Sequence, residues 1–183
     1  SSTTDQTLAG VISGTGVLTK AANSTLTLTN TNTYTGLTTV SAGTLTLDQA
    51  SSTTGTVIAN TAAVTVNGGI LNLADNTETI GALTLTAGSI TGASKTLTGS
   101  SYTLNPGEGV SVSIQPILAG SGINLTKSAA GTATLSGANT YTGTTTISAG
   151  TLTVTGTLSD STDVSNSGIY DVDVTDTINS LSG

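Results

Sequence analysis

The sequence contains no cysteine, histidine, methionine, tryptophan, phenylalanine or arginine. The absence of cysteine excludes disulfide bonds. Because the chain is short of nearly every side chain that carries catalytic chemistry, we expect a protein that is not an enzyme and that binds no cofactor.

Charge is scarce as well, at 7% of the residues, and ten acids outnumber three lysines. The net charge of −7 repels polyanions, and nucleic-acid binding needs several Lys or Arg side chains to neutralise phosphates. We therefore exclude nucleic acid as a partner. No apolar run reaches the roughly 18 residues of a membrane helix, so we expect no membrane span of that kind.

What the chain has in abundance is Thr, Ser and Asn together with Val, Ile and Leu. The polar residues alone would suggest disorder. Disordered chains, however, usually carry high net charge and few β-branched residues. The composition therefore predicts an ordered, all-β chain.

A long repeat is the first element of organisation. Shifting the sequence by 107 residues superimposes 18–47 on 125–154, and twenty of the thirty positions are then identical. In the same order, "ETIGALTL" at 78–85 resembles "DTINSLSG" at 176–183.

A shorter period lies inside the long repeat. Apolar-Thr-apolar triplets recur every nineteen residues from Leu26 to Tyr102. Such alternation is typical of a strand with one buried face, and a fixed step predicts that each strand lies in register on the last. Nineteen residues suffice for two or three short strands and their corners. The period therefore predicts a parallel β-solenoid, or β-helix, with about 19 residues per coil.

The period also predicts the core. Coils about 4.8 Å apart would give roughly nine or ten coils and a rod on the order of 45 Å long, stabilised by stacking. Two columns of like residues should fill it. The first column is Leu26, Leu45, Val64, Leu83 and Tyr102, and the second is Leu28, Leu47, Val66, Leu85 and Leu104.

We predict one solenoid domain over residues 1–183, with internal long repeats at 8–104 and 117–183 joined by a junction at 105–122. The junction holds both prolines, which cannot donate to a strand ladder. Because Val110, Val112 and Ile114 still alternate, we interpret it as a longer or looped-out coil rather than a linker.

Both long repeats carry N-T-Y-T-G followed by A-G-T-L-x-(L/V). The segments 16–47 ("GVLTKAANSTLTLTNTNTYTGLTTVSAGTLTL") and 122–154 resemble the autotransporter-associated β-strand repeat, also called the passenger-associated transport repeat. The identical phase of the two copies favours a structural role, with Asn stabilising a corner and Tyr packing over the coil. The motif residues are Asn32, Tyr34, Gly36 and Gly43 in the first copy and Asn139, Tyr141, Gly143 and Gly150 in the second.

The resemblance implies a right-handed β-helix that is secreted or lies on the bacterial cell surface, often as the passenger of a type V secreted autotransporter. We therefore expect a non-enzymatic structural protein, either a stalk or a fibre subunit. An adhesin segment is the alternative, and for its binding loop only 105–122 qualifies. A polysaccharide-acting β-helix would need a convergent polar cluster, and the sequence offers none.

Neither end of the sequence shows the polar cap that normally blocks the open strand edges of a solenoid. We expect either a segment of a longer passenger or a protomer that stacks head-to-tail into filaments. Self-association through the solenoid ends is then the expected partnership, with contacts to cell surfaces or polysaccharide as alternatives.

A column of threonines could carry a binding site. We expect five threonines at the nineteen-residue step to face outward, namely Thr27, Thr46, Thr65, Thr84 and Thr103. Flat arrays of paired Thr bind ice, but the neighbouring positions on either side of this column lose Thr after the first coil. This favours the interpretation that the five are ordinary solvent-facing strand residues rather than an ice-binding array.

An acidic segment closes the sequence. Residues two apart on a strand share a face at about 6.5–7 Å, which overlaps the carboxylate separation of an inverting glycosidase. However, Val172 and Val174 take the inward positions, and no Arg or His is present to orient a sugar. We therefore expect no catalytic residue, and a weak calcium site as the better interpretation. Its ligands would be Asp171, Asp173 and Asp176, with Asp160 and Asp163 joining.

Overall fold

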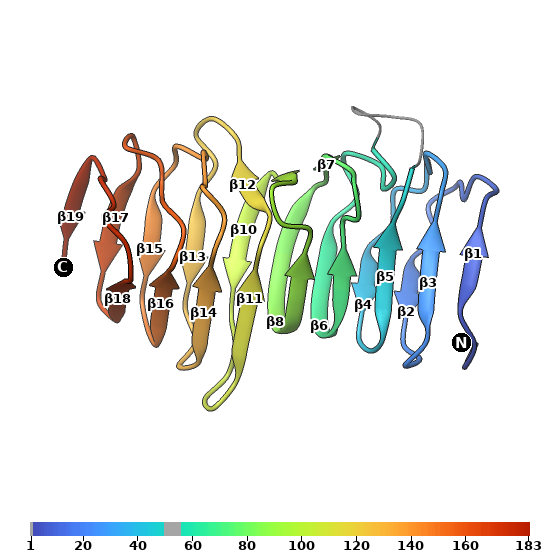
Figure 1. The fold of residues 1–183 in the computed structure, drawn as a ribbon, viewed down its shortest axis with the longest axis horizontal. Helices are drawn as coiled ribbons and strands as arrows, with labels where there is room; N and C mark the ends of the chain where they lie inside the picture. Colours follow the sequence, from blue (N-terminus) through green and yellow to red (C-terminus); the bar gives the residue numbers. More distant parts are fainter. Residues whose placement is uncertain (1, 50–55) are drawn as a thin grey trace.

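The computed structural model describes residues 2–49 and 56–183. Within those residues the chain forms strands and no helix, and hence no helix that is long and apolar enough to cross a membrane. The strands stack in parallel along a rod whose two termini lie at opposite ends (Figure 1). The fold is a parallel β-solenoid of about nine turns, with coils of about 19 residues.

Each coil contributes one strand to each of two long faces. At about 4.8 Å per step, the nine strand positions on a face span about 40 Å. The first face consists of β2 (Leu18–Lys20), β4 (Thr38–Val40), the first halves of β6 (Val64–Asn72) and β8 (Ala82–Thr91), β10 (Ser101–Leu104), β13 (Leu125–Lys127), β15 (Thr145–Ile147), β17 (Asp163–Asn166) and β19 (Ser180–Ser182).

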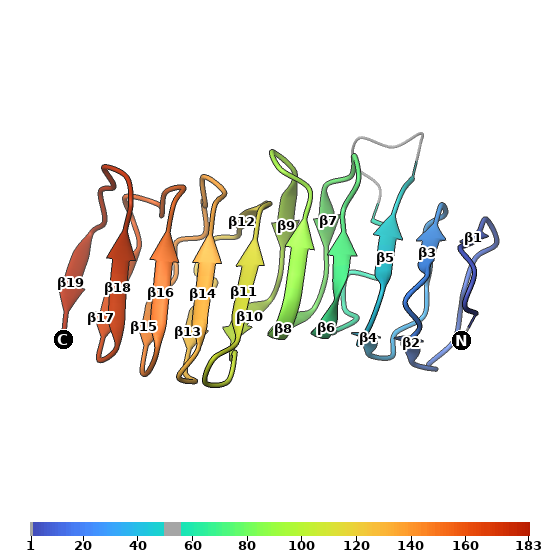
Figure 2. The same cartoon turned by 60° about the horizontal axis from the view of Figure 1, so that its bottom comes forward.

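In every coil a short turn leads from the first face to the second, and Figure 2 shows the strands of the second face side by side along the rod. It consists of β1 (Gln6–Leu8), β3 (Thr25–Leu28), β5 (Thr44–Leu47), the second halves of β6 and β8, β11 (Ser111–Ile114), β14 (Thr132–Leu135), β16 (Thr151–Val154) and β18 (Ile169–Val172).

A third side closes each coil. In the middle of the rod it is a three-stranded sheet, and elsewhere in the described residues it is irregular chain. The sheet consists of β7 (Glu78–Thr79), β9 (Thr96–Thr98) and β12 (Ile117–Ala119).

The core is a set of stacked apolar side chains between these sides. On the first face Val64, Leu83 and Tyr102 are buried and lie in register. On the second face Leu45 and Leu71 are likewise buried and lie in register. Since Val, Leu and Ile dominate and no Phe or Trp is present, successive coils can repeat one narrow cross-section.

Residues nineteen apart do not all lie on the same face of the rod, so each of the two expected columns is wrong, because its members are divided between the two faces. Leu26 pairs with Leu45 on the second face, whereas Val64 pairs with Leu83 on the first. The partner of Leu45 is Leu71. The second expected column is divided at the same point, between Leu47 and Val66: Leu28 pairs with Leu47, and Val66 pairs with Leu85, which pairs with Leu104.

Coil length explains the error. In the two coils concerned, corresponding strands on the two faces are seven residues apart, as for Thr38 with Leu45 and Val64 with Leu71. The coil from Leu45 to Leu71 is twenty-six residues long, and it includes residues 50–55, which lie outside the described part. Val64 lies seven residues before Leu71 and therefore nineteen residues after Leu45. The nineteen-residue step from Leu45 thus leads to a strand on the other face.

Residues 105–122 continue the rod as a coil. Val112 and Ile114 are buried on the second face, and β11 pairs with both β8 and β14. Pro106 and Pro116 each lie two residues beyond the end of a strand. The turn from β10 to β11 reaches further from the rod than its neighbours do (Figure 1).

Candidate functional site

The repeat motif forms a set of contacts along the third side, and its asparagines bridge three successive coils. The Asn139 Oδ1 accepts a hydrogen bond from the Leu118 backbone N (3.0 Å) in the preceding coil. Its Nδ2 donates to the Gly137 O and to the Thr157 O in the following coil, both at 2.9 Å. Asn32 repeats the arrangement with Ile12, Asn30 and Val57. These two side chains therefore satisfy corner backbone groups that no strand ladder reaches.

The motif tyrosines lie inside the solenoid. The hydroxyls of Tyr34 and Tyr141 lie 2.6 and 2.7 Å from the Oγ1 of Thr38 and Thr145. Both threonines are buried at inward positions of the first face, where a polar side chain needs a partner. Burial raises the pKa of both tyrosine hydroxyls. The Tyr141 ring also packs edge-to-face on Tyr102, with centroids 5.9 Å apart.

The motif glycines allow adjacent coils to approach. A Cβ at Gly143 would lie 2.2 Å from the Ile123 carbonyl oxygen of the preceding coil. Gly150 has a φ of +68° and also abuts backbone oxygens. Gly36 and Gly43 are equivalent. At all four positions a side chain would collide with these backbone oxygens, and at Gly43 and Gly150 the positive φ disfavours a side chain as well, so glycine is required.

Two buried lysines, which the sequence analysis did not single out as site residues, belong to the same site. The Lys127 Nζ donates to the Ala129 carbonyl of its own coil and to the Ala149 carbonyl of the next, at 2.9 Å for Ala149. Lys20 repeats this with Ala22 and Ala42. Burial lowers the pKa of Lys127. The signal in the sequence was the identity of these two lysines under the 107-residue shift.

Carboxylates take the asparagine position in other coils. The two Glu78 carboxylate oxygens accept from the backbone N atoms of Val57 (2.9 Å) and Ile58 (2.8 Å). Glu78 is completely buried, and burial raises its pKa to about 7. Asp176 accepts from the Leu158 backbone N in the same way. The likeness between "ETIGALTL" and "DTINSLSG" thus marks equivalent corners.

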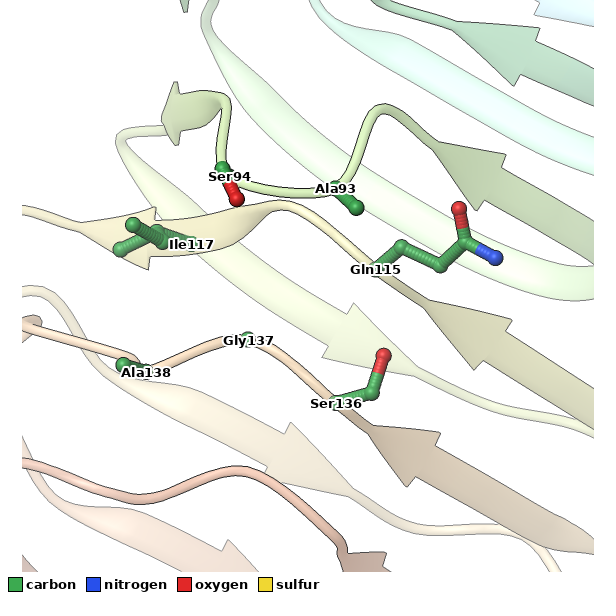
Figure 3. A pocket seen from close by; sticks show the side chains of 7 residues that line it. All are labelled: Ala93, Ser94, Gln115, Ile117, Ser136, Gly137 and Ala138. Atoms are coloured by element: carbon green, nitrogen blue, oxygen red, sulfur yellow. The ribbon is translucent and has the colours of Figure 1, made fainter.

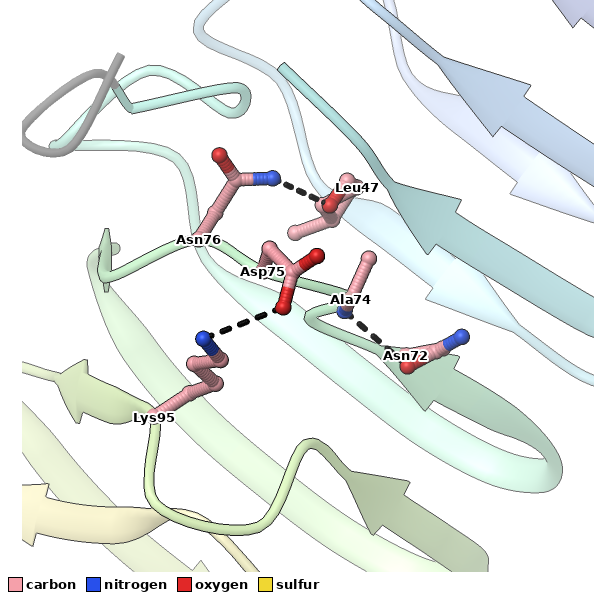
Figure 4. A network of polar contacts seen from close by, with 6 residues as sticks. All are labelled: Leu47, Asn72, Ala74, Asp75, Asn76 and Lys95. Atoms are coloured by element: carbon pink, nitrogen blue, oxygen red, sulfur yellow. Dashed lines mark hydrogen bonds and ion pairs between the residues drawn. The ribbon is translucent and has the colours of Figure 1, made fainter. Parts of the chain in front are cut away.

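A polar network on the surface beside β6 completes this region (Figure 4). The Asn76 Nδ2 donates to the Leu47 O at 2.5 Å, and the Asn72 Oδ1 caps the Ala74 backbone N. Lys95 and Asp75 form an ion pair at 3.1 Å. The Asp75 side chain is almost fully exposed, so this pair contributes little to stability.

The outward threonines are divided between faces like the core columns. Thr27 and Thr46 lie on the second face, and Thr65, Thr84 and Thr103 lie on the first. The expected single column is therefore wrong. The true first-face column is continuous along the rod and reads Thr19, Thr39, Thr65, Thr84, Thr103, Thr126, Thr146, Ser165 and Ser182.

The acidic residues do not converge. No group of three Asp or Glu side chains among residues 2–49 and 56–183 is arranged to hold a metal ion, so the structure does not bring Asp171, Asp173 and Asp176 together. The physical reason is that Asp176 bonds to the Leu158 backbone and to the Tyr170 hydroxyl, whereas the Asp171 carboxylate lies 3.4 Å from the Thr153 hydroxyl. Asp163 is held separately by Asn179 and Ser180.

The surface is hollowed where β8 and β11 run into the third side (Figure 3). This shallow hollow of about 340 Å³ has no ionisable side chain in its lining, so it offers no acid, base or nucleophile pair. Its lining residues are Ala93, Ser94, Gln115, Ile117, Ser136, Gly137 and Ala138.

Replacing Asn139 tests the corner contacts. Asn139→Ala removes three hydrogen bonds and leaves the buried Leu118 N–H without a partner, whereas the Gly137 and Thr157 carbonyls keep backbone donors. We expect it to lower the free energy of unfolding by about 3 kcal/mol. Asn139→Asp keeps the acceptor but places a buried carboxylate oxygen against the Gly137 and Thr157 carbonyl oxygens, so its loss at neutral pH should be at least as large. Urea unfolding followed by circular dichroism measures both, with the exposed Asn60→Ala as control. Equal midpoints for Asn139→Ala and Asn60→Ala would contradict this role.

Glu78 predicts a pH dependence. Because the pKa of Glu78 is raised from 4.5 to about 7, the folded state keeps a proton that the unfolded state releases between those values. The stabilisation is complete below about pH 4.5 and is lost as the pH rises through 7, with a total of about 3 kcal/mol. We expect this loss in the native chain relative to Glu78→Gln, measured by urea unfolding across that range.

The exposed Glu108→Gln is the matched control, and its unfolding should follow the native pH profile. Parallel profiles for the native chain and Glu78→Gln would show that Glu78 does not titrate in this way.

Comparison with known proteins agrees with this architecture. Residues 18–47 and 125–154 match the family described as the passenger-associated-transport-repeat. No curated protein and no solved structure matches the chain. The matched segments are those that hold Asn32, Asn139, the two buried lysines and the motif tyrosines and glycines. The chain thus contains two passenger-associated transport repeats, each built into a parallel β-solenoid.

Proposed function

We propose that this chain is a rigid, non-catalytic element of an extracellular bacterial β-solenoid, a stalk or fibre segment of the autotransporter-passenger type. The observation that carries the proposal is the motif itself, in which buried side chains of its two copies join neighbouring coils. Together with the strand ladders that run along the rod, these contacts resist bending and local unfolding, because opening one coil breaks contacts with two others.

The family supports the location. Passenger-associated transport repeats suggest a secreted or surface protein. The asparagines of the motif are also directed inward to backbone atoms, which favours a structural role for them. An adhesive role would have to use the long turn between β10 and β11 or the shallow hollow on the third side.

Head-to-tail self-association is part of the proposal. At the two ends of the described rod, apolar side chains on the edge coils are exposed, among them Val17 at one end and Leu181 at the other, with Leu181 61% exposed. Strand edges of this kind pair with any compatible edge. A contact between unlike ends does not close, so it propagates into a filament.

Negative-stain microscopy over a range of protein concentrations tests both the rigid rod and its head-to-tail self-association. We expect straight rods about 40 Å long at low concentration and longer filaments of the same width at high concentration. Leu181→Lys should abolish the filaments and keep the rods. Ile70→Lys is the matched control, because Ile70 is 38% exposed but lies away from both ends, between β5 and β8.

Single rods at every concentration would exclude head-to-tail assembly and leave the stalk segment. Irregular or compact particles would overturn the rod itself.

Ice binding is a second candidate function, which the corrected register favours. The first-face column is an unbroken series of seven Thr followed by two Ser. On the second face, outward pairs such as Thr132 with Thr134 and Thr151 with Thr153 stack in register. Hydroxyl groups repeated about every 4.8 Å on a rigid face can hold an ordered layer of water.

An ice-recrystallisation assay distinguishes this candidate from the structural role. If the first face binds ice, growth is inhibited by the native chain and by the third-side variant Thr140→Lys, but not by the mid-column variant Thr103→Lys. Equal activity of the two variants, or none in the native chain, excludes ice binding through this column.

A further inference from the structure

The turn between the two halves of β6 contains an asparagine with unusual surroundings. Asn67 is exposed, and the pairing of β6 with β8 is irregular on both sides of it. Within the described residues its side chain makes no hydrogen bond. By contrast, the amides of Asn32, Asn76 and Asn139 donate to buried carbonyls.

Asn67 is also the only asparagine in the sequence that is directly followed by glycine. Glycine has no Cβ, so nothing hinders the approach of its backbone nitrogen to the preceding side chain. Gly68 has a φ of +153°, in a region where residues with side chains are rarely found. The local sequence and the turn therefore combine a free amide with an unhindered neighbouring nitrogen.

We propose that Asn67 is a site of non-enzymatic covalent modification, namely deamidation through a cyclic imide. The Gly68 backbone nitrogen attacks the Asn67 Cγ and gives up its proton to water. The C–N bond of the side-chain amide breaks, and its nitrogen takes up a proton from water and leaves as ammonia. The product is a five-membered succinimide, formed without any change in oxidation state.

Water then opens the ring. Addition at Cγ gives aspartate, and addition at the backbone carbonyl carbon gives isoaspartate, whose main chain runs through the side chain. Either product adds one negative charge to a chain that already carries −7. Isoaspartate also lengthens the backbone by a methylene group.

The turn has little room for that extra length. A Cβ at Gly68 would lie 2.6 Å from the Ser41 carbonyl oxygen in the preceding coil. On the other side, the Gly69 carbonyl oxygen would lie 2.0 Å from a Cβ at Gly88 in the following coil. Isoaspartate at Asn67 therefore has to displace one of two neighbouring coils, and the modification should loosen the rod locally.

The test is to incubate the folded full chain at 37 °C in mildly alkaline buffer and to follow each asparagine by peptide mapping, with separation of aspartate from isoaspartate. Asn60 is the control within the chain: it is exposed, makes no hydrogen bond among the described residues, and precedes Thr61. We expect Asn67 to convert several-fold faster than Asn60. We also expect isoaspartate to accumulate there, and the melting temperature to fall as it does.

Asn67→Gln should remain folded and stay unmodified at this position, because glutamine would have to close a six-membered ring. Equal conversion of Asn60 and Asn67 would overturn the argument from the glycine neighbour. Conversion of Asn67 in the urea-unfolded chain but not in the folded one would show that the turn protects it, which overturns the proposal for the native protein.

Discussion

The constraint on which this structure depends is that every corner of a narrow solenoid leaves backbone N–H and C=O groups that no strand ladder can pair. Backbone groups of the adjacent coil pair some of these groups, and side chains supply further partners. Asn32 and Asn139 do so in both directions along the rod, and Lys20 and Lys127 bind carbonyls of two coils at once. Since each of these contacts crosses between coils, satisfying the corners is also what fastens the stack.

The same constraint occupies several of the polar side chains that could otherwise take part in chemistry. Lys20, Lys127 and Glu78 are buried, whereas most of the Asp side chains in the described residues are exposed and do not converge. Glu78 and Asp176 bind backbone N–H groups, and the Tyr102 hydroxyl accepts from the Gly99 N and donates to the Leu97 and Ala119 carbonyls. What faces solvent along the first face is a row of hydroxyls. This distribution fits a protein whose work is mechanical.

Corners filled by Asn and corners filled by Glu are not equivalent, although their geometry is similar. An amide is neutral at every pH and both donates and accepts, so it can join three coils. A carboxylate only accepts when ionised, and its burial carries a desolvation cost that grows as it loses its proton. The rod therefore combines pH-independent joints at Asn32 and Asn139 with one at Glu78 that weakens as the pH rises.

The sequence by itself determined the fold class, the approximate coil length and the equivalence of Asn32 with Asn139, because alternation and repetition are local properties of a chain. It did not determine which face each strand occupies. Leu45 and Val64 share a phase, yet a coil longer by seven residues places them on different faces, and only the register of the folded rod distinguishes the two cases. Nor could it determine that Lys20, Lys127 and Glu78 are buried, since a lone charged residue belongs on the surface unless several backbone groups converge on it. That convergence exists only after the neighbouring coils have stacked.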